Sequence, residues 1–165
     1  MARTLIIILL LASNIGCDQI SKQVVRQNIG YDEQFSFIND QLTLMKVENT
    51  GAFLSLGHTL PQPFKSILLN IIPVLVLGFA LLYLLTKKNL NNLTLLGVCF
   101  VGGGGIGNLY DRIIHGSVTD FVHIDFGFFQ TGVFNMADVS IMSGMVMILL
   151  DAWLNKTKPD EEMAS

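Results

Sequence analysis

The stretch VFNMADVSIMSGMVMILLDAWL, residues Val133–Leu154, is long and apolar enough to cross a membrane as one helix, yet it contains the acid Asp138. A carboxylate in such a segment is costly to insert, so by default it marks a functional site whose partner must be found. A second acid, Asp120, lies eighteen residues upstream, on the approach to the same segment. We therefore expect the two acids to meet at a membrane surface and to act as a pair.

The composition of the whole chain agrees with a membrane location. Its 165 residues are 51% hydrophobic and 14% charged, and the mean hydropathy is +0.54. These values are typical of a small polytopic membrane protein rather than a soluble domain. The net charge of −3, with no basic stripe, argues against a nucleic-acid partner. Cys17 and Cys99 both fall in apolar segments, which suggests neither a disulfide framework nor a metal knuckle.

Four apolar segments predict an all-α membrane protein with four transmembrane helices in a single domain, residues 1–165. The first apolar run, Thr4–Cys17, is shorter than a bilayer requires, so part of the polar segment that follows must complete it. The glycine run Gly102–Gly105, together with Gly107, favours close helix packing over a phosphate cradle, because no Lys-Ser/Thr pair follows it. The expected spans are approximately residues 4–22, 66–85, 93–112 and 133–154.

The sidedness of these spans follows from the distribution of positive charge. An even number of spans places both termini on one side of the membrane. Lys87 and Lys88 are concentrated in the short loop 86–92, so this loop and the tail 155–165 are predicted to be cytoplasmic. The segments 23–65 and 113–132 are then extracytoplasmic.

The first outer segment contains a hairpin signal. Apolar and polar residues alternate in Phe35–Ile38 and again in Gln41–Val47, on either side of the turn pair Asn39-Asp40. Such a ribbon can cradle an extended peptide along its edge, or it can simply cap the helices, and the pattern leaves both open. The second outer connection, Tyr110–Gly132, is rich in phenylalanine and is expected to dip into the membrane interface.

The paired acids suggest a chemistry. In a helix Asp138 would lie five residues into its span, about 8 Å below the outer end. Two carboxyl groups held close in a poorly hydrated place share one proton and titrate as a unit. The ionised member can take a proton from water, while the protonated member polarises a carbonyl and later protonates the leaving amine. These groups can carry out peptide hydrolysis. Ion or proton transport also remains open, as does a structural role for Asp138 in an interhelical hydrogen bond or an ion pair with Arg112.

Five segments, in order, resemble the bacterial lipoprotein signal peptidases (signal peptidase II), an intramembrane aspartyl protease family. The likeness extends from Asp18 to Gly144. Two departures are Ala52-Phe53, where the family more often has two alanines, and Gly105, where it more often has alanine. The five segments are Asp18–Lys22, Asn49–Ser55, Gly103–Arg112, Gly116–Phe121 and Phe134–Asp138.

The resemblance implies a function and a site. Asp120 and Asp138 would be the catalytic pair of a membrane endopeptidase, which removes signal peptides from diacylglyceryl-modified prolipoproteins by cleaving just before the lipidated cysteine. No cofactor or metal is implied, and His58, His115 and His123 lack ligand spacing. The implied partners are the lipid-modified substrates and membrane lipids, and the protein is expected to be a monomer. It would be a multi-pass protein of the bacterial inner membrane, with its active site near the outer face.

The resemblance also implies supporting residues, each with a simpler alternative. Amides around the dyad would orient the aspartates or bind the substrate backbone, or else only join helices. An acid and an arginine would pair at the rim of the site or form an ordinary interfacial ion pair. A carboxylate and a lysine four residues apart would lie near the substrate entrance or form a surface pair. These residues are Asn49, Asn108 and Asn135; Asp111 and Arg112; and Asp18 and Lys22, with Gly51 beside the first asparagine.

Overall fold

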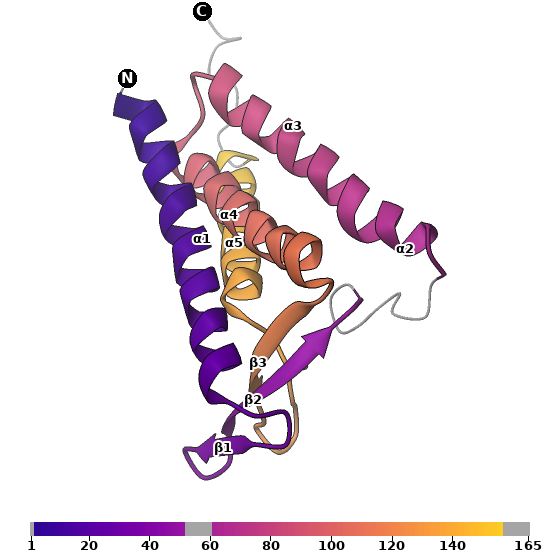
Figure 1. Ribbon diagram of the computed structural model, residues 1–165. Helices are drawn as coiled ribbons and strands as arrows, with labels where there is room; N and C mark the ends of the chain where they lie inside the picture. Colours follow the sequence, from indigo (N-terminus) through magenta and orange to yellow (C-terminus); the bar gives the residue numbers. More distant parts are fainter. Residues whose placement is uncertain (1, 52–60, 157–165) are drawn as a thin grey trace, which may run out of the picture.

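The computed structural model describes residues 2–51 and 61–156, which form four long helices and a small sheet at one end of them (Figure 1). Part of the second motif, Ala52–Ser55, lies outside the described residues. So do His58 and the predicted tail from residue 157 onward.

Among the described residues, four helical segments are long and apolar enough to cross a membrane. The predicted all-α membrane fold with four transmembrane helices is therefore confirmed. One of the segments, Phe64–Thr86, is continuous but contains a π-helical turn near its start. The elements are α1 (Ala2–Asn28), then α2 (Phe64–Ser66), η2 (Ile67–Ile71) and α3 (Ile72–Thr86) in one rod, α4 (Asn92–His115) and α5 (Met136–Lys156).

Two helix boundaries differ from the expectation. α1 continues without a break to Asn28, well past residue 22, so the polar residues after Cys17 do complete the first span. α5 begins only at Met136, because the preceding residues are extended and Phe134 pairs with Val122 of the sheet. Asp138 therefore lies in the first turn of α5, and the predicted depth of five residues into a helix was wrong.

The centre of the bundle is built on small residues, which let α4 and α5 approach closely. A Cβ atom added to Gly104 would lie 2.3 Å from the carbonyl oxygen of Ala137, and one added to Gly144 would lie 2.5 Å from that of Gly97. Backbone-to-backbone contact of this kind joins α4 and α5. A small apolar cluster of Ile7, Leu84, Leu95 and Cys99 packs α1, α3 and α4 together. Close packing through the glycine run of α4 is confirmed, and it brings the start of α5 against the middle of α4.

α3 stands apart from this pair. In Figure 1 it meets α1 near the N-terminus and diverges from it toward α2. The guanidinium of Arg3 donates hydrogen bonds to the carbonyl oxygens of Leu84 and Lys87, which ties the start of α1 to the end of α3. Most large apolar side chains of α3 are exposed, as expected of a helix that faces lipid.

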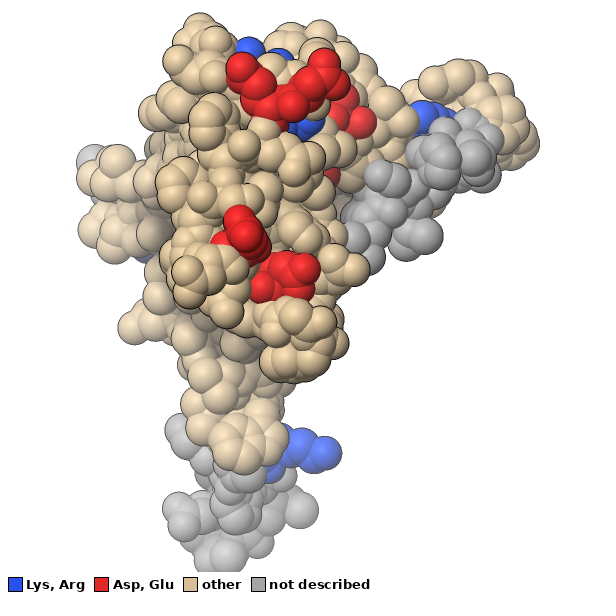
Figure 2. Space-filling model, turned by 90° about the horizontal axis from the view of Figure 1, so that it is seen from below, with Lys and Arg blue, Asp and Glu red and all other residues tan. Residues whose placement is uncertain are grey.

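The predicted hairpin is present and belongs to a larger sheet. Strands β1 (Gln34–Phe37) and β2 (Leu42–Asn49) pair antiparallel, and the turn residues Ile38, Asn39 and Asp40 all have positive φ. A third strand, β3 (Val118–Ile124), pairs with the other edge of β2, so the strand order is β1-β2-β3. Figure 2 looks onto the sheet end of the molecule and shows acidic side chains gathered in two places on a mostly uncharged face.

The third strand was not predicted, and it carries Asp120. A run rich in β-branched and aromatic residues between Gly116 and Asp125 was the available signal. An irregularity between Leu44 and Val47 shifts the register, so that Val47 lies opposite Asp120. The acid on the approach to α5 is thus held in a sheet rather than in a loose connection.

The contact at Gly104 gives the first test. We expect Gly104→Ala to lower the free energy of unfolding by about 1–3 kcal/mol, because the added methyl group meets the Ala137 carbonyl and overpacks the helix pair. Gly78→Ala is the matched control, since an added Cβ there meets nothing within 4 Å. Alanine in this open helical position should be neutral or stabilising. Thermal unfolding in detergent micelles measures both, and equal midpoints would contradict the packing argument.

Candidate active site

Asp138 is placed by the way α5 begins. The side-chain Oδ1 of Asn135 accepts a hydrogen bond from the backbone N–H of Asp138 at 3.0 Å. In return, Asp138 Oδ2 accepts one from the backbone N–H of Asn135 at 3.1 Å. This reciprocal pair is a capping box, with aspartate where glutamate or glutamine is more usual. The acid in the apolar stretch is therefore held at the positive end of a helix, where a carboxylate is favoured.

Asparagine side chains supply the remaining hydrogen bonds to the two acids. Asn108 of α4 donates to Asp138 Oδ1 at 2.9 Å. Asp120 accepts from Asn135 Nδ2 at 2.6 Å on one oxygen and from Asn49 Nδ2 at 3.0 Å on the other. Each of the four carboxylate oxygens thus receives an N–H group. Asn135 contacts both acids, so the structure brings Asp120 and Asp138 to one place, as predicted.

The orientation of these amides is set by groups that can only donate. Asn108 Oδ1 accepts from the ammonium of Lys22 at 2.8 Å and from Asn135 Nδ2 at 3.2 Å. Asn49 Oδ1 accepts from the backbone N–H of Gly51 at 2.9 Å. With the oxygens occupied in this way, the NH₂ groups must face the carboxylates. These bonds orient the two carboxyl groups, and those of Asn108 also join α4 to α1 and α5. The expected role of the asparagines in the site stays a prediction.

The two acids differ in their exposure. Asp120 is 4% exposed, and this burial is the largest influence raising its pKa, to about 6; the charge of Asp138 adds to the rise. The hydrogen bonds from Asn49 and Asn135 and the charge of Lys22 oppose it, because they favour the ionised form. Asp138 is only half-buried. The pair thus combines an enclosed carboxyl group with an accessible one.

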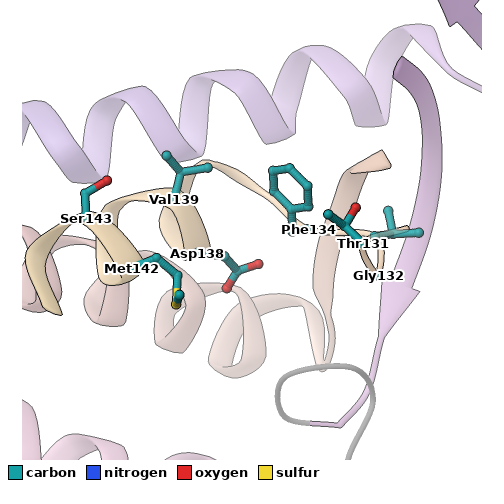
Figure 3. A pocket seen from close by; sticks show the side chains of 8 residues that line it. Thr131, Gly132, Phe134, Asp138, Val139, Met142 and Ser143 are labelled. Atoms are coloured by element: carbon teal, nitrogen blue, oxygen red, sulfur yellow. The ribbon is translucent and has the colours of Figure 1, made fainter. Parts of the chain in front are cut away.

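A pocket of about 290 Å³ lies beside Asp138 (Figure 3). One side is the extended segment Thr131–Phe134 that leads into α5, and the other is the face of α5 formed by Val139, Met142 and Ser143. In Figure 3 the Asp138 carboxyl group lies between these two sides. Asp138 is the acidic residue of a lining that is otherwise mainly apolar.

Asp18 and Lys22 are buried, which corrects the surface pair expected as one alternative. Both are 0% exposed, so they do not form a surface pair, while their expected place near the substrate entrance stays a prediction. The ammonium of Lys22 lies 2.8 Å from Asp18 Oδ2 and 2.9 Å from Asp111 Oδ2. Asp18 Oδ1 accepts the backbone N–H of Ala137 at 2.9 Å, in the first turn of α5. The pair therefore joins α1 to α4 and to the start of the helix that carries Asp138.

The expected pairing of Asp111 with Arg112 is also wrong. Asp111 is fully buried and pairs instead with Lys22 and with Arg26, whose Nη2 lies 3.0 Å from its Oδ1. Arg112 donates instead to the carbonyl oxygens of Gly51 at 3.1 Å and of Asn108 at 3.4 Å. Within residues 2–51 and 61–156, no ion pair joins Arg112 to Asp138. The other structural alternative for Asp138, an interhelical hydrogen bond, is present, because Asn108 of α4 donates to Asp138 of α5.

Comparison with known proteins identifies the family. Residues 7–154 match the family described as Signal peptidase (SPase) II. The chain belongs to the signal peptidase II family. It is 35% identical over 124 residues to the lipoprotein signal peptidase of Aquifex aeolicus (strain VF5), covering 75% of this chain and 71% of that one. It is 33% identical over 139 residues to that of Streptococcus pyogenes serotype M1, covering 84% and 87%.

Solved structures agree with this fold. One bacterial membrane enzyme, solved at 2.3 Å resolution, superposes with a TM-score of 0.83 at 21% identity, covering 96% of this chain and 94% of the other. A second, solved at 1.9 Å, gives a TM-score of 0.77 at 23% identity, covering 92% and 94%. As a signal peptidase II the chain is a membrane-embedded aspartic protease that removes signal peptides from prolipoproteins.

Arg26 is a polar residue of the site region that the sequence reasoning missed. It follows Lys22 by four residues, as Lys22 follows Asp18, so the three share one face of α1. That spacing was the available signal. Its Nε donates to the hydroxyl of Thr119 at 2.8 Å, which links α1 to the strand that carries Asp120.

The raised pKa of Asp120 predicts the pH dependence of this signal peptidase. If Asp120 and Asp138 are the catalytic pair that the sequence suggests, the pair loses its one proton as the pH rises through the raised pKa of Asp120, and kcat/KM should fall above a pH of about 6. Asn49→Leu removes an N–H donor that favours ionised Asp120, so the falling limb should move to higher pH. Initial rates from about pH 4 to about pH 9 measure this. A limb that stays in place in a folded Asn49→Leu protein would contradict the assignment.

Proposed function

We propose that the chain cleaves diacylglyceryl-modified prolipoproteins just before the lipidated cysteine, with Asp120 and Asp138 activating the attacking water. The single observation that carries the proposal is the meeting of the two acids at Asn135, beside an apolar pocket. Two carboxyl groups brought together from a strand and a helix, one of them buried, titrate as a unit that holds one proton, because both cannot ionise easily side by side. The N–H groups on their oxygens fix the orientation of the two carboxyl groups.

The different surroundings of the two acids suggest their roles. Asp138 faces the pocket and is the group that a water molecule beside the scissile bond reaches, so it takes the proton of that water. Asp120 is enclosed, its pKa is raised by burial, and it holds the proton that polarises the scissile carbonyl. The proton that Asp138 gains passes to the leaving amine as the peptide bond breaks. The other proposed site residues hold these groups in position, and all of them come from one chain, so we expect a monomer to be active.

We further propose that the sheet end of the molecule lies at the outer face of the bacterial inner membrane. The basic loop residues Lys87 and Lys88 lie at the end of α3, next to Arg3 of α1 and far along the helices from the dyad. Short basic loops stay in the cytoplasm. In this orientation the segments 23–65 and 113–132 are extracytoplasmic, and the segments 86–92 and 155–165 are cytoplasmic. The dyad can then reach a peptide bond just above the acyl chains of the substrate, which remain in the outer leaflet.

Loss of either acid should abolish cleavage. We expect Asp120→Asn and Asp138→Asn to lower kcat for a lipidated precursor by at least about 100-fold, because an amide can neither take the proton from water nor return it. Asp151→Asn is the matched control: this acid lies on α5 but at the other end, where it contacts Thr94. Thermal unfolding in micelles verifies folding of each variant. Full activity in either folded dyad variant would overturn the proposed mechanism.

The lipid on the substrate should matter for binding. Each acyl CH₂ group that stays in the apolar phase contributes about 0.8 kcal/mol, so a precursor that lacks diacylglyceryl loses most of its anchoring energy. We expect its kcat/KM to be far lower than that of the same sequence carrying the lipid. The two precursors are compared with wild-type enzyme in the same micelles. Equal turnover would contradict the acyl-anchor argument while leaving the role of the dyad intact.

A further inference from the structure

The two proposed catalytic acids reach the site on elements that are anchored differently. Asp138 is fixed by the cap of α5 and by Asn108 of α4. Asp120 lies on β3, at the edge of the three-stranded sheet. The later part of β3 is tied to the start of α5 through the backbone of Phe134, whose carbonyl accepts the N–H groups of Phe121 and Val122. What holds the earlier part of the strand decides how Asp120 faces Asp138.

The backbone ladder to β2 and the Ser117 hydroxyl on Glu48 hold this earlier part to the sheet, and Thr119 adds the bond that ties it to α1. Thr119 immediately precedes Asp120, so its side chain points to the opposite face of the strand. It is 0% exposed, and its hydroxyl donates to Glu48 Oε1 at 2.8 Å while accepting from Arg26 Nε at 2.8 Å. One hydroxyl thereby joins strand β2 and helix α1 to β3.

Arg26 carries this link to the helices. Its Nε binds the hydroxyl of Thr119, and its Nη2 lies 3.0 Å from Asp111 Oδ1 of α4. The guanidinium uses two nitrogens of its rigid fork for two different partners, which a lysine ammonium cannot reproduce. Asp111 in turn pairs with Lys22, which binds the Asn108 amide that donates to Asp138.

We propose that Arg26 and Thr119 are positioning residues for the reaction: they hold β3 against α1 and α4 and so set how Asp120 faces Asp138. This rests on the proposed role of the two acids. Among the described contacts, neither residue touches the carboxyl groups of Asp120 or Asp138, so each acts through the groups that it holds: the strand β3, and for Arg26 also Asp111. Polar contacts run without a gap from Thr119 to Asp138. The series is Thr119, Arg26, Asp111, Lys22, Asn108 and Asp138. We expect this series to set the distance between the two acids.

Thr119→Val tests the proposal with little change in shape. Valine keeps the volume and the β preference of threonine but removes both hydrogen bonds of the hydroxyl. We expect kcat to fall by about 10- to 100-fold, as for a misplaced catalytic group, with KM nearly unchanged. Thr119→Ser keeps the hydroxyl and should restore most of kcat. Thr43→Val is the matched control, since Thr43 is a buried threonine of the same sheet whose hydroxyl, among the described residues, bonds Ser36 of the outer strand β1.

Arg26→Lys gives a second route to the same result. The lysine can pair with Asp111 but cannot also bridge to Thr119, so kcat should fall as it does in Thr119→Val. The double variant should be no worse than either single one, because both changes break the same link. A simply additive double variant would overturn the shared link.

A purely structural role makes a different prediction. It would lower the unfolding midpoint of Thr119→Val and leave kcat per folded molecule at the wild-type value, and that result overturns the proposal. Asp120→Asn, assayed beside it, separates the two ideas. If Asp120→Asn is inactive while folded Thr119→Val is fully active, the dyad stands and the positioning role fails.

Discussion

The structure depends on one constraint: α5 begins inside the protein, so its first backbone N–H groups have no water to bind. An unsatisfied N–H group in such a place is expensive, and side chains must replace the solvent. Asp18 accepts the N–H of Ala137, and Asn135 accepts that of Asp138. Asp138 completes the cap by accepting the N–H of Asn135. The residue proposed for catalysis is thus also part of what allows the helix to start where it does.

The burial of Asp18 requires the charges around it. A carboxylate at 0% exposure needs a partner, which Lys22 provides, and Lys22 in turn is shared with Asp111. With Arg26, the cluster holds two acidic and two basic side chains, so its charges balance. Breaking a buried pair by removing one partner is far more destabilising than the pair itself is stabilising. These residues therefore behave as a unit, and the Asn108 amide connects that unit to Asp138.

The sequence predicts the features that depend on composition and short-range pattern. Apolar length marks the four helices, the Asn39-Asp40 turn marks the hairpin, and the cost of an acid in an apolar segment singles out Asp138. Features that depend on tertiary contact were missed. Hydropathy does not register a cap, so α5 was expected to begin at Val133. A spacing of four residues is the same on a buried helix face as on an exposed one. The sequence therefore does not show whether Asp18 and Lys22 lie at the surface or in the interior.

The missed strand shows the same limit at the site itself. Nothing in Val118–Ile124 alone says which edge it will join, because β2 already has a partner in the hairpin and the third strand comes from a distant part of the chain. Its pairing determines where Asp120 lies: buried, with a raised pKa, while Asp138 faces the pocket. Two like groups acquire separate roles only when their surroundings differ. The sheet therefore makes the surroundings of the two acids different, because it buries Asp120. The residues at the start of α5 bring the acids together, because Asn135 bonds both of them.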